Sequence, residues 1–516
     1  MGSSKSGHLT AKPAPAGSTS LQTEAKSARW FSPSPALWER ASDTEPACAA
    51  PKATRPLMPT TDAYPRLTTV KPPHSSAGTT PTRRNFIKNG SMMLAGGAIG
   101  SGTLSVAQSA HVIGSDTIKI GLVGCGGRGT AAAIQALNAG DRGVKLVAMA
   151  DAFGSNLQKS YRSIKSMHSD QVDCVGRRYE GLDAYQSVMD SDANVVFLAT
   201  PPGFRPQHFE AAVDAGKHIF MEKPVATDAP GVRRVLAANQ VAKKKGLAVQ
   251  VGLQRRHEVP YQQCIEQIQR GAIGDLIFAR AYWNGGGVWV RPRQKNQTEL
   301  GYQLRNWYYF TWLGGDHIDE QHIHNLDVIN WVAQSYPIEA QGVGGREVRT
   351  GPDHGQIFDH HMVEYTYRNG LKLLSQCRHI QGCWNSVSEH IHGTTGVADI
   401  SRSVIRDRNG KKQWESSHTA TRGKGCQLEQ DALFAALRAG HLPNEGDYGA
   451  YSTMTAIMGR MATYSGKRVK WSDAMNSTTQ LADTDALKSL EDLAPIQPTT
   501  NGRYAVAVPG NKSTIA

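Results

Sequence analysis

The sequence predicts an α/β domain built on a parallel sheet, followed by an α+β domain whose sheet is mostly antiparallel. Strand and helix patterns alternate over residues 115–252, which is typical of a parallel sheet with helices on both faces. Over residues 253–490 the strand patterns become longer, and two of them flank Asn369-Gly370, a strong hairpin signal. At 516 residues the chain is long enough to bury the cores of both domains.

The first strand pattern, residues 118–123, ends in the glycine-rich turn Gly124-x-Gly126-x-x-Gly129, and a helix pattern follows at once. In such a turn the first glycine makes the tight bend, the second leaves room for a pyrophosphate, and the third lets the helix pack close to the strand. A plain glycine turn is the alternative. However, a second strand pattern ends in Asp151, about 20 residues after the last glycine, where a ribose-binding carboxylate is expected. We therefore predict a Rossmann dinucleotide-binding domain.

The same carboxylate bears on the choice of cofactor. Asp151 can accept a hydrogen bond from a free ribose 2′-hydroxyl and would repel a 2′-phosphate, so the sequence favours NAD over NADP. Arg128 in the loop and Arg162 further along could weaken this preference. The residues expected to contact the cofactor are Gly124, Gly126, Gly127, Arg128, Gly129, Asp151, Thr200, Pro201, His208, Glu222 and Lys223.

Two later strand patterns of this domain end in candidate functional residues. The domain continues as strand, helix, strand, helix and strand at 195–199, 209–215, 217–221, 231–245 and 247–251. Thr200-Pro201 follows the first of these strands and Glu222-Lys223-Pro224 the second, at the carboxyl ends where doubly wound sheets bind ligands. A partly desolvated lysine has a lowered pKa there, which suits proton transfer or binding of a substrate hydroxyl. A surface ion pair between Glu222 and Lys223 is the alternative.

The second domain is predicted from its strand patterns and two late helices. A strand is expected at 275–282, and the hairpin joins 362–367 to 371–375. Helices at 427–439 and 449–466 are expected to return to the first domain and brace it.

A polar cluster occupies residues 314–327, with the sequence Gly-Gly-Asp-His-Ile-Asp-Glu-Gln-His-Ile-His-Asn-Leu-Asp. On one helix Glu320, His324 and Asp327 share a face, because they are spaced i, i+4, i+7. A carboxylate one turn from an imidazole orients the ring and raises its basicity, so His324 could accept a hydroxyl proton as hydride leaves the adjacent carbon. A capped helix with core histidines is one alternative. A metal site of His317, Glu320 and His324 is another, but the sequence offers no clear further ligand, so no metal is predicted.

Aromatic residues are concentrated between these motifs, at Tyr282, Trp283, Trp289, Trp307, Tyr308, Tyr309 and Trp312. Aromatic faces with polar rims suit sugar rings, so these residues are candidates for binding a sugar. The alternative is that they form an interdomain or dimer core, and each interpretation can hold for different residues of the group. The candidate substrate contacts are Arg256, Trp283, Trp307 and Tyr308.

The two ends of the chain differ in composition from its middle. Residues 1–80 are rich in Pro, Ser, Thr and Ala and are predicted to be disordered, with Met58 a candidate for the true start. The motif Arg-Arg-x-Phe-Ile-Lys then opens the segment 81–110, which resembles a twin-arginine export signal; a basic linker is the alternative. This segment is too short and too glycine-rich for a stable membrane span. The tail, residues 491–516, is expected to wrap the surface.

Charge and cysteine content argue against two other classes of protein. The formal net charge is +13, of which residues 1–110 contribute +7 through 12 Lys and Arg against 5 Asp and Glu. The rest of the chain carries only +6 without a dense basic stripe, so a nucleic-acid partner is not indicated. The seven cysteines show no CxxC pair and no metal-type spacing, so a disulfide framework is not expected.

The motifs together resemble those of the Gfo/Idh/MocA oxidoreductase family, from about residue 118 to about residue 477. That family combines a glycine loop, a Thr-Pro turn, Glu-Lys-Pro and Asp-x-Gly-x-His-x-x-Asp. The corresponding residues here are Gly124 to Gly129, Thr200-Pro201, Glu222-Lys223-Pro224 and Glu320-x-His322-x-His324-x-x-Asp327. Glu320 stands where the family usually has Asp, and His322 where it usually has Gly; both departures bear on the acid–base arrangement and the substrate pocket.

The resemblance implies roles and an assembly. It implies that Lys223 and His324 are catalytic, with Glu320 and Asp327 as supporting groups. It also implies an open-faced sheet in the second domain, through which the chain forms homodimers or homotetramers. The segment His392-Gly-Thr-Thr-Gly396 resembles the turn that follows a strand of that sheet.

These expectations combine into an exported, periplasmic, NAD-dependent oxidoreductase that acts on a sugar, polyol or glycoside. Since little free NAD is available outside the cytoplasm, the cofactor is expected to be tightly bound and regenerated in place. The hydride then passes to a second sugar, or a glycoside is cleaved by oxidation, elimination, hydration and reduction. The rival is a non-catalytic protein that senses a nucleotide or sugar on the same fold, although a sensor needs neither Lys223 nor His324.

Overall fold

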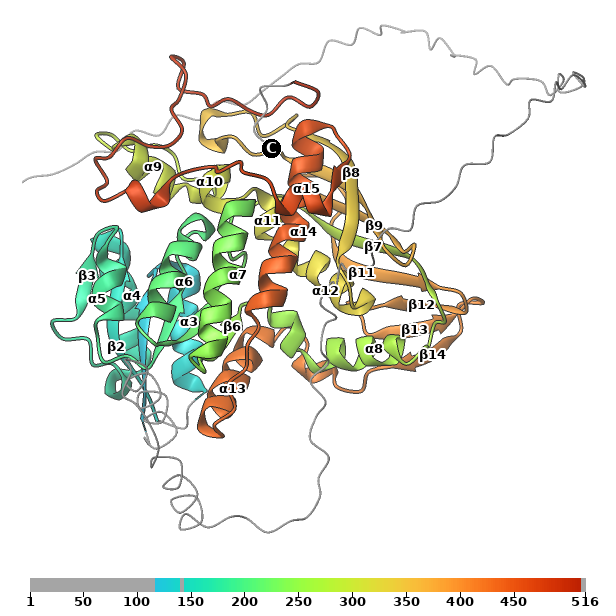
Figure 1. The fold of residues 1–516 in the computed structure, drawn as a ribbon, viewed down its shortest axis with the longest axis horizontal. Helices are drawn as coiled ribbons and strands as arrows, with labels where there is room; N and C mark the ends of the chain where they lie inside the picture. The colour runs from blue at the N-terminus through green and yellow to red at the C-terminus, as the bar shows by residue number, and fades with distance from the viewer. Residues whose placement is uncertain (1–116, 140–142, 512–516) are drawn as a thin grey trace, which may run out of the picture. The chain divides into compact units, whose positions relative to one another are not determined.

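The computed structural model describes residues 117–139 and 143–511. The predicted leader, the candidate start Met58 and the twin-arginine segment 81–110 lie outside these residues. The described chain folds around two sheets, one parallel and one mixed (Figure 1). None of its described helices combines the length and the apolar character needed to cross a membrane.

The first sheet is parallel, as predicted, with the strand order β3-β2-β1-β4-β5-β6. Each position of β4, Val-Val-Phe-Leu, is buried, because both faces of the sheet are covered by helices. The order reverses between β1 and β4, the place where a doubly wound sheet opens a ligand crevice at its carboxyl edge. The strands are β1 (Ile118–Val123), β2 (Val144–Asp151), β3 (Arg178–Glu180), β4 (Val195–Leu198), β5 (His218–Met221) and β6 (Val249–Val251).

The helices of this domain are α3 (Gly127–Asn138), α4 (Gly154–Met167), α5 (Ala184–Met189), α6 (Arg205–Asp214) and α7 (Ala229–Lys244). Both α6 and α7 begin earlier than their apolar patterns predicted. Proline explains the difference, because Pro206 and Pro230 occupy the first turn, where a missing N–H removes no helical hydrogen bond. Asp228 caps α7 by accepting a hydrogen bond from the N–H of Gly231.

The second sheet has nine strands in the order β14-β13-β12-β11-β7-β10-β9-β8-β15. β7 and β10 pair in parallel and the other neighbours pair antiparallel, so the sheet is mostly antiparallel, as predicted. β9 and β10 form the expected hairpin, and Gly370 in its turn has a φ of +87°. The strands are β7 (Leu276–Gly285), β8 (Pro337–Gly345), β9 (His360–Tyr367), β10 (Lys372–His379), β11 (Ser386–Gly393), β12 (Gly396–Asp399), β13 (Val404–Asp407), β14 (Lys412–Glu415) and β15 (Val469–Lys470).

One face of the second sheet is packed and the other is open. On β9 the buried side chains of His361, Val363 and Tyr365 alternate with the more exposed Met362 and Glu364. The packed face lies against helices α12 and α14. The helices of this part are α8 (Val259–Gln269), α9 (Glu299–Arg305), α10 (Thr311–Gly314), α11 (His317–Glu320), α12 (Ile323–Ala333), α13 (Gly425–Arg438), α14 (Gly446–Ser465) and α15 (Trp471–Met475). The short 3₁₀ helices of the chain are η1 (Ser169–Gln171), η2 (Pro202–Phe204), η3 (Gln254–His257), η4 (Trp307–Tyr309), η5 (Pro352–His354), η6 (Thr419–Thr421) and η7 (Thr484–Ala486).

The two late helices return to the first domain, as predicted. Phe434 of α13 belongs to the core of the parallel sheet and stacks on Phe197 of β4, with ring centroids 6.4 Å apart. α14 packs between α7 and β8, and it runs alongside α7 in Figure 1. The tail over residues 491–511 has no strand, and Tyr504 packs its ring 4.9 Å from that of Phe310.

Candidate active site

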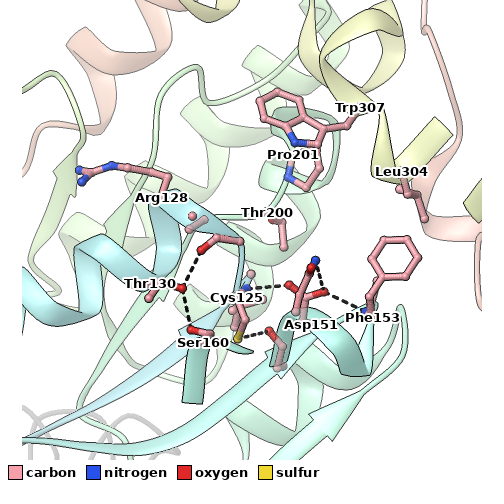
Figure 2. A pocket seen from close by; sticks show the side chains of 18 of the residues that line it. Cys125, Arg128, Thr130, Asp151, Phe153, Ser160, Thr200, Pro201, Leu304 and Trp307 are labelled. Carbon is pink, nitrogen blue, oxygen red and sulfur yellow. Dashed lines mark hydrogen bonds between the residues drawn. The ribbon is translucent and has the colours of Figure 1, made fainter. Parts of the chain in front are cut away.

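A cavity of about 620 Å³ lies where the order of the parallel sheet reverses. Its size is within the range of ligand and cofactor sites, roughly 300–1,000 Å³. Figure 2 shows side chains from both domains around it. The predicted cofactor contacts that line it are Gly124, Gly126, Gly127, Arg128, Asp151, Thr200, Pro201 and His208. Gly129, Glu222 and Lys223 are not among the residues that line it.

The glycine loop has the steric features that contact with a phosphate requires. Gly124 has a φ of +96°, and a Cβ at this position would lie 2.6 Å from the backbone of Ala199. A Cβ at Gly129 would lie 1.9 Å from the carbonyl oxygen of Gly124, so the close approach of α3 to β1 depends on this glycine. Around Gly126, by contrast, no described atom lies within 4 Å of the Cβ position, which leaves space for a ligand.

Asp151 ends β2 with its carboxylate fixed by two backbone groups. Oδ2 accepts a hydrogen bond from the N–H of Cys125 at 2.7 Å, and Oδ1 accepts one from the N–H of Phe153 at 2.8 Å. Burial raises the pKa of this carboxyl above its ordinary value, and the two hydrogen bonds oppose that shift. The side chain lines the cavity, so its orientation is set before any ligand binds.

The basic residues near the cavity differ in whether they line it, and Arg128 does so as predicted. Arg128 forms ion pairs with Glu222 and with Glu429 of α13, the latter at 2.8 Å. Arg162 does not line the cavity. Lys159 of α4 does line the cavity, although the sequence analysis did not identify it. The sequence offered one signal for it: Lys159 lies on the helix that follows Asp151 at the end of β2.

Thr200 and His208 form a second fixed group at the carboxyl end of β4. Thr200 Oγ1 lies 3.0 Å from Nδ1 of His208, and the ring of His208 packs 4.3 Å from that of Tyr185. Burial lowers the pKa of His208 to about 3, so its imidazole is neutral. This neutral pair adds no charge next to the cavity.

A segment of the second domain covers the cavity. We call its lining residues the cavity roof: Trp289, Arg291, Leu304, Arg305 and Trp307. The rings of Trp289 and Trp307 meet edge to face at 5.9 Å, and the Arg291 guanidinium lies 4.7 Å above Trp289. Arg305 lies 4.4 Å above the ring of Phe153, next to Asp151, so the roof contacts the first domain. Of the roof residues, the sequence analysis named Trp307 as a candidate substrate contact. The only sequence feature that pointed to the other roof residues was the concentration of aromatic and basic residues in this part of the chain.

Lys223 follows β5 and reaches the second domain. Its Nζ donates to Oε1 of Glu320 at 2.8 Å and to the backbone carbonyl of Glu320 at 2.5 Å. The two side chains are 11% and 16% exposed, respectively. Glu222 pairs with Arg128. The structure thus rejects the surface pair between Glu222 and Lys223 and joins Lys223 to the motif that contains His324.

The prediction of one helix carrying Glu320, His324 and Asp327 on a single face is wrong. α11 ends at Glu320 and α12 begins at Ile323. At the break the N–H of His322 bonds to the carbonyl of His317 at 3.1 Å, five residues earlier, which departs from the four-residue step of a continuous α-helix. The three residues considered for a metal have separate partners: Glu320 pairs with Lys223, the ring of His317 packs against His361, and His324 lies beyond the break, stacked on Trp283.

Asp327 and Arg256 pair with each other. Nε and Nη2 of Arg256 donate to the two carboxylate oxygens of Asp327 at 2.9 and 2.8 Å, and Asp327 also accepts from Ser452. The Arg256 guanidinium stacks 3.9 Å from the ring of Tyr448. Arg256 is not among the residues that line the cavity, so its contact with substrate stays a prediction, and Asp327 binds this arginine rather than His324.

His324 is held by stacking. Its ring stacks on that of Trp283 of β7, with centroids 6.0 Å apart and 24° between the planes, and the residue is 6% exposed. Nδ1 has no hydrogen-bond partner among the described residues. Burial lowers the pKa of His324 well below its ordinary value, and the charge of Lys223 lowers it further. The imidazole is therefore neutral, and the lone pair of its unprotonated nitrogen is free of a bound proton.

Of the remaining aromatic residues predicted to contact substrate, one positions His324 and others are buried in the hydrophobic core. Trp283 supports His324, as described, and so does not offer both faces to a ligand. Tyr308 is 3% exposed, and its ring stacks on His379 at 5.8 Å. Trp312 is fully buried in the same cluster. Burial of Tyr308 and Trp312 agrees with the core interpretation, Trp289 and Trp307 line the cavity, and contact of these aromatic residues with a sugar stays a prediction.

Residues 118–253 match the Gfo/Idh/MocA oxidoreductase family model, described as its NAD-binding Rossmann fold. Curated relatives include a 1-carboxy-3-chloro-3,4-dihydroxycyclohexa-1,5-diene dehydrogenase of Comamonas testosteroni, 30% identical over 30% of this chain and 35% of its own. An inositol 2-dehydrogenase of Acidiphilium cryptum is 24% identical over 50% of this chain and 66% of its own. The chain thus spans between about a third and two thirds of these two relatives.

Solved structures extend the likeness to the second domain. The WlbA dehydrogenase of Bordetella pertussis, in complex with NADH and UDP-GlcNAcA, is 20% identical with a TM-score of 0.55, over 69% of this chain and 97% of that one. A levoglucosan dehydrogenase, in complex with NADH and levoglucosan, is 17% identical with a TM-score of 0.53, over 69% of this chain and 99% of that one. At these identities the likeness establishes the fold, a Rossmann domain followed by a domain with a mixed sheet.

Proposed function

We propose that this chain is an NAD-dependent oxidoreductase that transfers hydride to and from a hydroxyl-bearing carbon of a sugar, polyol or glycoside. The observation that carries the proposal is the meeting of Lys223, Glu320 and a neutral His324 beside the carboxyl edge of the parallel sheet. β4 and β5 are neighbours in that sheet, so Lys223 emerges next to Thr200 and Pro201, which line the cavity. Acid–base groups next to a dinucleotide site are what oxidation of an alcohol requires.

The chain's own residues divide the work as follows. The Lys223 ammonium, oriented by Glu320, donates a hydrogen bond to the substrate hydroxyl. His324, neutral and stacked on Trp283, accepts the hydroxyl proton. Bound NAD would accept the hydride from the same carbon. Gly126 leaves room for its pyrophosphate, and Asp151 would hold the adenosine ribose.

The relatives support the class of substrate. Inositol 2-dehydrogenase is named for a polyol, and levoglucosan dehydrogenase was solved with an anhydrosugar and NADH. The residues facing the cavity from above, Trp289 and Trp307, are aromatic, and aromatic rings suit the apolar C–H faces of such rings. We therefore favour a cyclic polyhydroxy substrate over a linear acid.

We also propose that the cofactor is held tightly and regenerated in place. The cavity roof lines the dinucleotide site from a different domain, so contacts from two domains would slow cofactor release. Export would make such retention useful, since little NAD is free to exchange outside the cytoplasm. A second sugar could then receive the hydride. The alternative, cleavage of a glycoside by oxidation, elimination, hydration and reduction, uses the same retained cofactor.

We also propose a periplasmic location, which the arginine pair at 83–84 supports. Replacing both arginines by lysine is expected to abolish export of the full-length chain, measured by fractionating cells into cytoplasm and periplasm. Equal periplasmic amounts of the two proteins would contradict the export proposal without affecting the catalytic one.

The open face of the second sheet supports a homodimer or homotetramer. It carries the exposed apolar side chains of Val343 and Met362, which are 67% and 42% exposed, and Trp384 of the loop between β10 and β11, 63% exposed, packs against Tyr282 of β7. Val343 and Met362 are direct cross-strand neighbours on β8 and β9. An apolar surface of this kind is typical of an interface. Sedimentation of the wild type and of Met362→Glu would show whether this face is used.

The experiment that tests the activity begins with the form that starts near Gln108. The protein is denatured and any released nucleotide is identified by mass spectrometry. The native protein is then mixed with inositols, glucosides and anhydrosugars without added cofactor, and reduction of the bound nicotinamide is followed by absorbance. Bound NAD that a cyclic polyol reduces would support the proposal. Bound nucleotide that no such compound reduces would favour the sensing protein, and an empty site that binds neither NAD nor NADP would refute both.

A further inference from the structure

A group of buried histidines lies between α11 and the packed face of the second sheet, apart from the residues assigned to hydride transfer. His317 begins α11, His361 lies on β9 and His379 on β10; they are 0%, 3% and 2% exposed, respectively. The ring centroid of His317 is 4.8 Å from that of His361 and 4.2 Å from that of His379. So dense a cluster of imidazoles is unusual in a core that is otherwise apolar.

His317 is the informative member, because neither of its ring nitrogens has a hydrogen-bond partner among the described residues. A neutral imidazole carries one N–H donor and one lone pair, and both are normally satisfied when the ring is buried. The geometry thus leaves a lone pair without a partner inside the protein.

Three potential ligands converge at this place. One donor atom from each of Asp316, His317 and His361 lies within 4.8 Å of the other two. Nε2 of His361 is 3.3 Å from Oδ2 of Asp316, and Nε2 of His317 is 3.8 Å from Oδ1 of Asp316. Small movements of these side chains would bring all three atoms to a shared ion at roughly 2.0–2.2 Å.

The surrounding hydrogen bonds orient these ligands in the way that metal sites require. Nδ1 of His361 is 2.9 Å from the hydroxyl of Thr463, which leaves Nε2 directed to the site. Oδ2 of Asp316 accepts from the Tyr464 hydroxyl at 2.6 Å and from the N–H of Phe358 at 3.0 Å. Oδ1 also accepts from the N–H of His317, and since a carboxylate has about four lone-pair positions, these three bonds still leave Asp316 able to bind an ion.

We propose that Asp316, His317 and His361 bind one divalent transition-metal ion, with Zn²⁺ the ion that best fits two imidazoles and a carboxylate. Imidazole excludes Ca²⁺ and Mg²⁺ as the preferred occupants, since those ions favour oxygen ligands. The ion is structural. It joins the start of α11 to β9, and Glu320, the partner of Lys223, lies at the other end of α11. This inference stands on the histidine cluster and does not depend on the proposed oxidoreductase activity.

The test is the metal content of the whole chain. The protein is expressed with added Zn²⁺, passed over a chelating resin and measured by mass spectrometry of the elements, and a sample refolded with Co²⁺ is examined for visible d–d absorption. We expect about one Zn²⁺ per chain in the wild type, and loss to background in His317→Ala and His361→Ala. His441→Ala, which removes an exposed histidine elsewhere, is expected to keep the ion.

Either of two results would overturn the proposal. The first is a folded wild-type protein without Zn²⁺ and without a Co²⁺ absorption band. This result would overturn the proposal even if the alanine variants fail to fold. The second is an ion retained in full by both His317→Ala and His361→Ala, which would place the metal elsewhere. Far-ultraviolet circular dichroism separates loss of the ion from loss of the fold.

Discussion

Lys223 and Glu320 are separated by 97 residues in the chain and joined by an ion pair of 2.8 Å between Nζ and Oε1. One residue follows β5 of the parallel sheet and the other ends α11 of the second domain, so the pair links the two domains. A free lysine is flexible, whereas this ammonium is held by a carboxylate and a backbone carbonyl. A substrate hydroxyl that binds here meets a donor whose position is already fixed.

Replacing Lys223 by Ala is expected to lower turnover by roughly 10²–10⁴-fold, the usual effect of losing a positioned acid–base group. The measurement is the rate of hydride exchange between substrate and bound nicotinamide, with circular dichroism to show that the fold persists. Lys372→Ala is the matched control, because Lys372 forms a 3.2 Å ion pair with Glu364 on the open sheet face. Equal turnover in the two variants would remove Lys223 from the proton-handling pair.

The pH dependence of turnover provides a separate test of His324. Its pKa is lowered by burial and by Lys223, so the neutral form should persist below the ordinary value of about 6.5. We expect the wild-type rate to stay flat as the pH falls from about 8 through 6.5 and to drop only in more acid solution. His324→Ala should be slow throughout. An acid limb centred near 6.5 that disappears in His324→Ala would contradict the buried, neutral ring.

Acid should also destabilise the fold through histidines buried in the neutral form. The pKa is lowered to about 3 for His208 and His322 and to about 4 for His218 and His379. Each folded pKa lies below the unfolded value, so the unfolded chain binds protons first, and stability is lost as the pH falls from about 6.5 towards the folded pKa. Each such histidine contributes at most about 1.4 kcal/mol per pH unit.

Urea unfolding at several pH values between neutral and about 5 measures this loss. His208→Gln should flatten the pH dependence by about one proton, because glutamine does not titrate. His441→Gln, at an exposed position, should leave the slope unchanged. A free energy of unfolding that is constant over this pH range would show that these rings are already solvated or charged in the native protein.

Local physics explains which parts of the fold could be predicted from the sequence. Gly124, Gly129 and the Asn369-Gly370 turn are positions where backbone geometry admits few residues, and the structure bears each of them out. The break between α11 and α12 could not be read in the same way. The i, i+4, i+7 spacing is compatible with one helix, and the backbone leaves it at Gln321-His322 without a proline or glycine to signal the change.

The ion pairs of the candidate site depend on distant partners and therefore escaped prediction. Arg128 could pair with a phosphate or with a carboxylate, and it pairs with Glu429, 301 residues later. The partner of Arg256 could not be predicted either; in the structure Arg256 pairs with Asp327 inside the second domain. Sequence patterns report what a residue can bind, but only the packed fold decides which partner is within reach.

Replacing Asp151 by Asn tests the choice between NAD and NADP. The amide oxygen can still accept from the N–H of Cys125, but the NH2 group replaces the oxygen that accepts from the N–H of Phe153, so one of the two backbone bonds is lost. The negative charge is lost as well, so repulsion of a 2′-phosphate disappears. We expect NAD binding to weaken by about tenfold, about 1.4 kcal/mol, and the ratio of NADP to NAD affinity to rise. Calorimetric titration of nucleotide-free protein measures both, with Asp170→Asn on the surface as control. An unchanged affinity ratio would leave Lys159 and the rest of the cavity to set the preference.

Removing part of the cavity roof should release the cofactor faster. Trp307 lines the cavity and contacts Trp289 edge to face, so Trp307→Ala opens the roof without touching the glycine loop or Asp151. We expect the dissociation rate of NAD to rise by at least about tenfold, while the affinity changes less because association also becomes easier. The measurement is uptake of isotopically labelled NAD into protein that holds unlabelled cofactor, followed by mass spectrometry. Trp414→Ala on β14 is the matched control, since Trp414 is half-buried and is not among the residues that line the cavity. If Trp307→Ala exchanged cofactor no faster than Trp414→Ala, the roof would not be the barrier to release, and retention would have to come from the contacts of the first domain alone.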